Sequence, residues 1–434
     1  MSNFSLNDHG MRTFWLYIKQ AWRLLGQNRL ATVIAVAGTA LAIGMIMVLV
    51  ILFVANTAAF KPEIHRSDTY YVSFVKTEGK ADGRRISMTS LGLPLVESCL
   101  YPLESAELVT AYIRQTWTKS DLRTMDGLRT FNATVSATDT AYWRLFDFDF
   151  LSGAPFTGAA FKSGLPEVVL SETAARALFG NEQVTGREVK IDFVTYRVCG
   201  VVRDVSRFAS VAWSDVWLPY TSLSDYDASR SGGISGSFEC AILLREGSDR
   251  EALRQEFSRR VDHFNAALTD IRANFLHQPY SHLERWVGVG EAETPVSRFF
   301  IRMGVILLIL LLVPALNLSG IILAWTRKRI PEFGLRRAYG ATRRQILGQV
   351  MIENLLVTFM GGLIGFLLSY VAIWFLRDWL LVSSLGQERL SIGMVNGLVF
   401  AAVFLLCLVL NLLSALLPAW KAARGTISDA LNGR

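Results

Sequence analysis

The chain has 434 residues, of which 51 % are apolar and 19 % are charged, and its formal net charge is +7. Charged residues are scarcer than the roughly 25 % typical of soluble domains, and the apolar residues are concentrated in a few long blocks. This composition argues against an ordinary soluble protein. The positive charge does not indicate nucleic-acid binding, because much of it lies beside the apolar blocks, where membrane topology explains it.

The first 29 residues carry apolar side chains at helical spacing among basic ones. The apolar positions are Phe14, Trp15, Ile18, Trp22 and Leu25. This pattern is typical of an amphipathic helix in the cytoplasmic interface of a membrane, so we predict such a helix over residues 1–29. The alternative is a simple cytoplasmic extension of the first membrane span.

Four segments are apolar and long enough to cross a bilayer as helices: residues 30–56, 300–326, 350–376 and 391–417. Each contains a long uncharged run, whereas a single charge at the centre of a spanning helix costs roughly 2.5–3.5 kcal/mol. Four buried helices of a large soluble core would not need such runs. The first block is also too long for the apolar core of a cleavable signal peptide, so we expect it to remain as an anchor.

Basic residues predict the orientation, because short cytoplasmic loops are enriched in Lys and Arg. They precede the first span, fill the loop at residues 327–349 and recur in the tail at residues 418–434, whereas charges between the third and fourth spans balance. Both termini and the 327–349 loop are therefore predicted to be cytoplasmic. The large segment at residues 61–298 is predicted to lie outside the cytoplasm.

This outer segment has the pattern of a folded α+β domain. Ser171 and Gly180 bracket a predicted helix at residues 173–179, and apolar spacing predicts a longer helix at residues 249–267. β-branched and aromatic residues predict strands at residues 69–75, 167–170, 197–202 and 238–244. The predicted fold class is an α-helical membrane protein with four transmembrane helices and a large extracytoplasmic α+β domain between the first two.

No pattern in the chain predicts catalysis or metal binding. The histidines show no HExxH spacing, no GxSxG elbow occurs, and no GxxxxGK[ST] phosphate loop is present. We therefore expect no catalytic residue, metal or cofactor on this chain. The cysteines form no CxxC pair, and whether one disulfide joins two of Cys99, Cys199 and Cys240 is left open.

Small residues inside the predicted spans allow helix backbones to approach closely. Gly361 and Gly365 form a GxxxG pair, and Ala40 and Gly44 form a second small pair. Either a neighbouring helix or a second subunit could pack against them. Glu353 is the acidic residue nearest to a span; a functional role, an interfacial position and a pairing with a loop arginine are all open.

Residues 327–346 read RKRIPEFGLRRAYGATRRQI, which resembles the cytoplasmic signature of the MacB/FtsX-like family of ABC transporter permeases. Pro331 departs from that signature, but proline suits the first turn of a helix. Residues 418–424, PAWKAAR, resemble the family's C-terminal ending, and residues 142–220 are similar to its periplasmic core. The signature positions that match are Glu332, Gly334, Arg336, Arg337, Ala338, Gly340, Ala341, Arg343 and Ile346.

The resemblance implies a MacB-like periplasmic core domain at residues 61–298 and an FtsX-like permease domain at residues 299–424, in the bacterial inner membrane. It further implies a pair of permease chains, as a homodimer or a heterodimer, each served by an ABC ATPase subunit that holds ATP and Mg. A periplasmic adaptor and an outer-membrane channel are further candidate partners, besides the lipid bilayer.

In such a complex the 327–349 loop would act as a coupling helix that docks on the ATPase, and the outer domain would move as a lever. The residues implied in docking are Glu332, Phe333, Gly334, Leu335, Arg336, Arg337, Ala338, Gly340, Ala341 and Arg343. Independently of the family, Leu335, Ala338, Tyr339 and Ile346 supply an apolar face beside the loop arginines. Membrane topology alone would explain the charge of this loop.

Two other functions stay open on the sequence. The chain could be an ATPase-linked membrane regulator or sensor of cell-envelope processes that moves no cargo. It could also be a membrane enzyme with its site in the outer domain, although no motif supports this. The identity of a cargo is not indicated by any residue pattern.

Overall fold

The computed structural model describes residues 29–288, 296–310 and 338–380, together with single positions outside these ranges. The chain divides into two compact units. The outer unit contains residues 55–296, and the helical unit contains the described helices on either side of it in the sequence.

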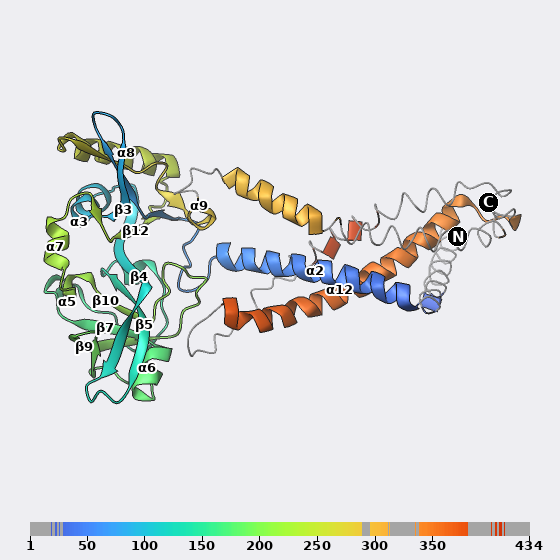
Figure 1. Ribbon diagram of the computed structural model, residues 1–434, viewed down its shortest axis with the longest axis horizontal. Coiled ribbons are helices and arrows are strands. Elements are labelled where there is room, and N and C mark those ends of the chain that lie inside the picture. The colour runs from blue at the N-terminus through green and yellow to red at the C-terminus, as the bar shows by residue number, and fades with distance from the viewer. Residues whose placement is uncertain are drawn as a thin grey trace, which may run out of the picture. The chain divides into compact units, whose positions relative to one another are not determined.

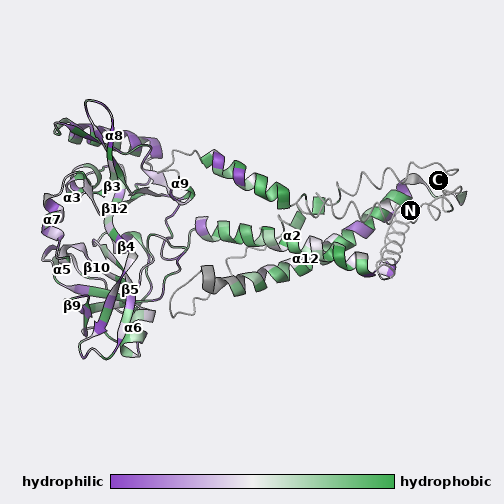
Figure 2. Cartoon of the chain, in the orientation of Figure 1, coloured by the Kyte–Doolittle hydropathy of each residue, from purple (hydrophilic) through white to green (hydrophobic). Residues whose placement is uncertain are grey.

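Two long helices dominate the described part of the helical unit (Figure 1). Helix α2 covers Arg29–Thr57 and helix α12 covers Arg343–Leu380. Both are long and apolar enough to cross a membrane, and Figure 2 shows their mainly hydrophobic composition. Residues 296–310 are also helical. Most of the predicted elements at 1–29, 311–326, 391–417 and 418–434 lies outside the described residues.

Helix α12 begins at Arg343, within the segment predicted as a loop at residues 327–349. The physical reason is that hydropathy marks only the part of a helix that fits the bilayer. The first turn of α12 is polar and is stabilised by a capping interaction at Thr342, so the helix continues beyond its apolar part.

The outer unit combines strands and helices in an α+β arrangement. Its strands are β1 (Thr69–Val72), β2 (Val75–Gly79), β3 (Arg85–Leu91), β4 (Ala106–Thr124), β5 (Thr130–Thr138), β6 (Phe150–Gly153), β7 (Glu167–Ser171), β8 (Glu188–Ile191), β9 (Val194–Val202), β10 (Val216–Pro219), β11 (Ser235–Gly236), β12 (Glu239–Leu244), β13 (Ile271–Asn274) and β14 (Tyr280–Ser281). Its helices are α3 (Leu93–Leu95), η1 (Val96–Leu100), α4 (Tyr142–Leu145), α5 (Gly158–Lys162), α6 (Glu172–Phe179), η2 (Tyr220–Ser222), α7 (Tyr226–Ser231), α8 (Arg250–Ala266) and α9 (His282–Val287).

A ten-stranded mixed sheet forms the centre of the outer unit. Its order is β14-β1-β12-β4-β5-β10-β7-β9-β6, with β8 pairing with both β4 and β9. The pairs β10–β5 and β7–β9 are parallel, and the pairs that involve β4 are antiparallel. A separate four-stranded sheet has the order β11-β3-β2-β13. The long strand β4 therefore links the two halves of the main sheet.

Apolar side chains cover both faces of the main sheet. Alternate residues of one strand enter different cores: Leu218 joins the core that includes helices α6 and α8, whereas Trp217 joins the core that includes α4. All four residues of β10 are buried, as expected for a central strand with both faces covered.

Local sequence signals predicted several of these elements correctly. Strand β7 and helix α6 are confirmed: the Ser171 hydroxyl accepts a hydrogen bond from the Ala174 amide at the N-cap, and Gly180 ends the helix at φ +78°. The strand predicted at residues 69–75 is instead divided into β1 and β2. The amides between them, at Ser73 and Phe74, donate to the Gln278 side chain and not to a neighbouring strand.

Candidate functional site

The predicted coupling loop is described in part. Leu335, Ala338, Gly340 and Ala341 are described, and Arg343 is described by its backbone. The other predicted docking residues lie outside the described residues; they are Glu332, Phe333, Gly334, Arg336 and Arg337.

The described part of this loop is a helical turn that stops at a glycine. The Tyr339 amide donates to the Leu335 carbonyl oxygen (3.1 Å), and Gly340 follows with a φ of +96°. Glycine adopts that backbone conformation without the strain that other residues suffer, which suits Gly340 to end the turn. Leu335 is 54 % exposed and Tyr339 is 85 % exposed. The turn therefore presents two large apolar side chains at the surface.

A capping box separates this turn from α12. The Thr342 hydroxyl accepts a hydrogen bond from the Gln345 amide (3.4 Å), and the Gln345 side-chain oxygen accepts one from the Thr342 amide (2.8 Å). Ile346 is buried and packs with Ala35 and Val36 of α2. The predicted apolar face of the loop therefore does not include Ile346, because the break at Gly340 places that residue on a different helix.

The predicted small-residue pairs of the spans lie against one another in the structure. A Cβ added at Gly365 would be 2.6 Å from the Ala40 carbonyl oxygen, and one added at Gly44 would be 3.3 Å from the Gly365 carbonyl oxygen. One added at Gly361 would be 2.7 Å from the Cβ of Thr39. The backbones of α2 and α12 thus approach as closely as small residues permit.

Glu353 lies on the buried side of α12. Its carboxylate accepts a hydrogen bond from the Gln349 amide group, with 3.2 Å between Nε2 and Oε1, one helical turn earlier. Glutamine and glutamate at this spacing share one face of a helix. This contact is a polar pair within one helix.

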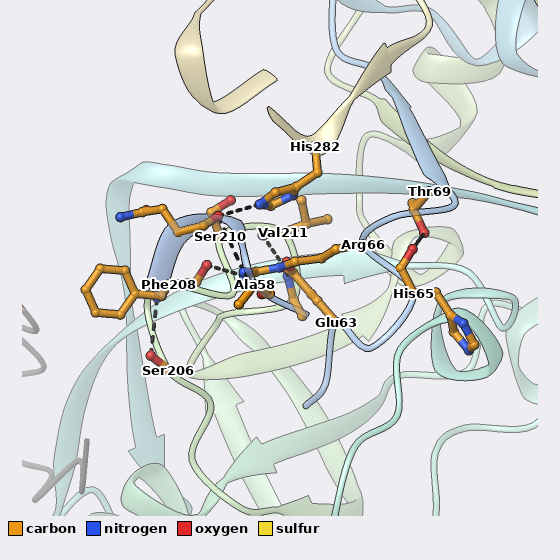
Figure 3. Close-up of polar contacts among 12 residues, drawn as sticks. Ala58, Glu63, His65, Arg66, Thr69, Ser206, Phe208, Ser210, Val211 and His282 are labelled. Carbon is orange, nitrogen blue, oxygen red and sulfur yellow. Dashed lines mark hydrogen bonds and ion pairs between the residues drawn. The ribbon is translucent and has the colours of Figure 1, made fainter. Parts of the chain in front are cut away.

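A second polar site surrounds the end of α2 (Figure 3). We call it the exit cluster and define it as Glu63, Arg66, His282 and the backbone of residues 208–212. The ends of helices leave carbonyl oxygens without partners, and α2 has no basic residue in its own last turn. Side chains from the outer domain supply the missing donors.

The Arg66 guanidinium makes most of these contacts. Its Nη1 donates to the carbonyl oxygens of Ala58 (2.6 Å), Ala55 (3.4 Å) and Asn56 (3.4 Å). Its Nη2 donates to the Phe208 carbonyl oxygen. The Nε2 atom of His282 lies 2.8 Å from the Asn56 carbonyl oxygen. Positive charge at a helix C-terminus is also favoured by the helix dipole.

Glu63 completes the exit cluster as the partner of Arg66. Its Oε2 accepts from Arg66 Nε at 2.7 Å, and both side chains are almost fully buried, with 1 % and 2 % exposed. The other oxygen, Oε1, accepts from the amides of Val211 and Ala212, each at 2.9 Å. Both charges are therefore paired and hydrogen-bonded, as buried charges must be.

A pair of arginines connects the 208–212 segment to the main sheet. Arg114 of β4 donates to the Ser210 carbonyl oxygen (2.7 Å), and Arg285 of α9 donates to the Ser210 hydroxyl (3.3 Å). Both arginines also bind the Glu239 carboxylate of β12, at 2.8 Å and 3.3 Å. Ser210 thus joins the exit cluster to strands at the middle of the sheet.

The charges of this region shift its protonation equilibria. Burial tends to raise the pKa of Glu239, but Arg114 and Arg285 outweigh burial and lower it below its usual value. Burial, followed by the charge of Arg66, lowers the pKa of His282. Glu239 therefore stays ionised and His282 stays neutral near neutral pH.

The sequence analysis missed the exit cluster. One signal was present: Glu63 and Arg66 lie three residues apart directly after the uncharged run of the first span. Nothing in the sequence indicates that residues 208–212, about 145 positions later, bind the same two side chains. The three outer cysteines, Cys99, Cys199 and Cys240, are free thiols in the structure. Within the described residues, no group of three or more His, Cys, Asp and Glu side chains is placed to hold a metal.

The structure explains one motif that resembled the family. Residues 151–153 read LSG, and a Cβ added at Gly153 would lie 2.1 Å from the Cys199 carbonyl oxygen. Gly153 also has a φ of +66°. Gly153 therefore lets β6 approach β9 closely.

Two family profiles match most of the chain. The family profile of the MacB-like periplasmic core domain matches residues 32–260, and that of the FtsX-like permease C-terminal region matches residues 304–427. The periplasmic region of MacB from Actinobacillus actinomycetemcomitans, a solved structure, has a TM-score of 0.36 and 18 % sequence identity, over 48 % of this chain and 89 % of that one.

The similar sequences are permeases. YknZ of Bacillus subtilis, an uncharacterized ABC transporter permease, is 25 % identical over 300 residues, which are 69 % of this chain and 70 % of YknZ. The macrolide export ATP-binding/permease protein MacB of Wolinella succinogenes is 26 % identical over 426 residues, which are 94 % of this chain and 59 % of that protein. The chain therefore spans about three fifths of the MacB length. Because the periplasmic core profile alone covers more than half of the residues, the chain belongs to the MacB/FtsX-like family of ABC transporter permeases.

Proposed function

We propose that this chain is the membrane subunit of an ABC transporter complex in the bacterial inner membrane, with four spans and both termini cytoplasmic. It couples ATP hydrolysis on a partner subunit to movement of its periplasmic domain during export or extraction of a substrate. The observation that carries the proposal is the exposed turn with Leu335 and Tyr339 directly before α12.

Exposed apolar side chains on a charged loop are typical of a protein–protein contact, and aromatic residues often dominate the binding energy of such contacts. Helix α12 begins at Arg343, shortly after this turn ends at Gly340, and runs without a proline for 38 residues. At 1.5 Å per residue it is about 57 Å long, which exceeds the roughly 30 Å of a bilayer's hydrocarbon core. A push on the turn would reach, through the short connection at residues 340–342, a continuous helix long enough to cross the membrane.

The ATP-binding part is expected outside these 434 residues, because no GxxxxGK[ST] motif occurs in them. The MacB relatives are named ATP-binding/permease proteins, and this chain covers 59–60 % of their length. ATP and Mg would bind to that ATPase, and a second permease chain would complete a dimer. A periplasmic adaptor and an outer-membrane channel remain candidate partners.

The test is a pair of substitutions, Leu335→Ser and Tyr339→Ala, in the full chain purified with the ATP-binding subunit that accompanies it. Removing a hot-spot tyrosine costs at least about 2 kcal/mol of binding energy, or more than tenfold in affinity. We expect the ATPase to dissociate and substrate flux to fall. Phe193→Ala is the matched control, because Phe193 is an equally exposed aromatic residue in the outer unit.

The proposal would be wrong if no ATP-binding subunit accompanied the wild-type chain, or if both variants kept full binding and coupled activity. If binding fell as expected but whole cells showed no efflux dependent on the chain, the ATPase-linked regulator would be the correct function.

A further inference from the structure

A moving helix can displace a neighbouring domain only if its end is held firmly to that domain, and the end of α2 is held in this way. The last turn of α2, Ala55–Thr57, belongs to the outer unit, whereas the rest of α2 belongs to the helical unit. The last carbonyl oxygens of a helix have no partner within the helix and often bind water, and the last turn often frays. At α2 they are held by Arg66 and His282, so this end is bound to the domain by side chains as well as by the chain itself.

We propose that Arg66 and Glu63 are positioning residues that tie the last turn of α2 to residues 208–212 and, through Ser210, to strands β4 and β12. This inference rests on the proposed coupling function. When α2 shifts, the exit cluster passes the displacement to the middle of the main sheet, and not only along the connection from Thr57 to β1.

The geometry of Arg66 supports this role. A guanidinium presents five donors in a rigid plane. Here Nη1 binds carbonyl oxygens at and just after the end of α2, while Nη2 binds Phe208 and Nε binds Glu63. The guanidinium carbon also lies 4.2 Å from the centre of the Phe60 ring. A lysine, with all its donors on one nitrogen, does not reach these separate acceptors together.

The path onward is made of hydrogen bonds in which one partner is charged. Glu63 holds the amides of Val211 and Ala212, and Ser210, next to them, is held by Arg114 and Arg285. Charged hydrogen bonds are shorter and stronger than neutral ones. Residues 210–212 are thus bound to Glu63 on one side and to Arg114 and Arg285 on the other.

The test uses the full chain with its ATP-binding subunit in lipid nanodiscs and measures amide hydrogen exchange by mass spectrometry, with and without ATP plus vanadate. The main variant is E63L/R66M, which replaces the buried ion pair by apolar side chains of similar volume. The matched control is Lys61→Met. Lys61 lies in the same connection and pairs with Asp147 (3.1 Å) and Asp149 (2.8 Å), but these side chains are exposed.

We expect exchange at Val211 and Ala212 to quicken by roughly tenfold in E63L/R66M, because these amides lose a charged acceptor. We also expect the nucleotide-dependent change in exchange of β4 and β12, seen in the wild type and in Lys61→Met, to disappear in E63L/R66M. The ATPase rate should stay close to that of the control, whereas the unfolding temperature should fall, because backbone groups bound by Glu63 and Arg66 lose their partners.

Unchanged exchange at Val211 and Ala212, or a nucleotide response in E63L/R66M equal to that of the wild type, would overturn the inference. A wild-type complex without any nucleotide response would count against the proposed function, and the exchange at Val211 and Ala212 would still decide whether the tie exists. If E63L/R66M does not fold, Arg66→Lys is measured in the same way, with a weakened response expected and an unchanged one contradicting the role of Arg66.

Discussion

Replacing Gly365 by alanine should weaken the packing of α12 against α2. The added Cβ would lie 2.6 Å from the Ala40 carbonyl oxygen and 3.1 Å from the Cβ of Ile43. Carbon–oxygen contacts of this type normally begin at about 3.3 Å, so the helices must separate locally by roughly 0.7 Å. The obstructing atom belongs to the backbone of α2, so no change of rotamer can relieve the contact.

The cost of this separation can be bounded. Overpacking of a well-packed contact costs about 1–3 kcal/mol, and a gap of this size also removes a quarter or more of the dispersion energy between neighbouring side chains. Ile43, Ile46 and Met47 are buried beside the contact and would feel that gap. Against this, alanine gains up to about 1 kcal/mol over glycine in helix propensity. Comparing Gly365→Ala with a glycine-to-alanine substitution elsewhere in α12 cancels this gain in helix propensity, because both variants share it.

Gly348→Ala supplies that comparison, because no atom lies within 4 Å of its added Cβ. Unfolding of the purified chain in mixed micelles, followed by circular dichroism during titration with a denaturing detergent, measures both variants. We expect Gly365→Ala to be less stable than Gly348→Ala by about 1–3 kcal/mol. Equal stability of the two variants would refute the argument that backbone contact at Gly365 sets the distance between α2 and α12.

A rescue experiment sharpens this test. At Gly361 the added Cβ would meet the Thr39 side chain, at 2.7 Å from its Cβ and 2.8 Å from its Cγ2. The variant Thr39→Gly removes both atoms, so it should restore part of the stability lost in Gly361→Ala. The same substitution should restore nothing to Gly365→Ala, whose obstruction is a carbonyl oxygen. Rescue of both glycine variants to the same extent would show that the loss is general and not local.

Three further outcomes are expected. The pKa of His282 is lowered in the folded state, so the unfolded chain binds more protons as the pH falls. The contribution of His282 to the free energy of unfolding is therefore fully present above pH ~6.5 and is lost as the pH falls below that value. Thermal unfolding measured from about pH 7.5 to about pH 5.5 should show this loss, and His282→Gln should reduce it. Arg66→Ala should lower the free energy of unfolding by about 3–5 kcal/mol, since it leaves the Glu63 carboxylate buried and unpaired, and E63L/R66M should lower it clearly less. Equal losses for the two variants in chemical denaturation would contradict this reasoning. Gly153→Ala should lower the free energy of unfolding by at least about 1–2 kcal/mol, because alanine is strained in the left-handed backbone conformation of this position, and the contact with Cys199 should add to the loss. Gly158→Ala is the control: its added Cβ meets no described atom within 4 Å, so its stability should stay near that of the wild type.

Local features of the fold could be predicted from local sequence. The first span was predicted at residues 30–56, because a charge is costly to bury in lipid, and the structure has helix α2 there, at Arg29–Thr57. Ser171 and Gly180 predicted the ends of α6 because capping needs only residues close in sequence. The TxxQ pattern at Thr342 and Gln345 was equally readable, and it would have predicted the early start of α12.

Features that depend on long-range pairing could not be predicted in this way. Strand β4 runs from Ala106 to Thr124, and its partners β5, β8 and β12 all follow it, from Thr130–Thr138 in β5 to Glu239–Leu244 in β12. The exit cluster is another example. A sequence window shows Glu63 and Arg66 as an ordinary charged pair at spacing three; only the folded sheet brings the amides of Val211 and Ala212 to Glu63 and so makes the pair buried and specific.

The two described helix ends that face the proposed moving parts are fixed by side-chain hydrogen bonds. At the start of α12 the capping box of Thr342 and Gln345 satisfies two amides, and at the end of α2 Arg66 and His282 satisfy carbonyl oxygens. Each such bond contributes roughly 0.5–1.5 kcal/mol, and a bond to a charged group contributes about 1.5–3 kcal/mol. Two or three of them lower the population of a frayed turn by at least about tenfold, because 1.4 kcal/mol corresponds to a factor of ten. A helix that frays at its end absorbs a displacement by unwinding, whereas a capped one passes it on. If the chain couples ATP hydrolysis mechanically as proposed, stiff ends of both helices would serve that coupling, and the buried ion pair of Glu63 and Arg66 would stiffen one of them.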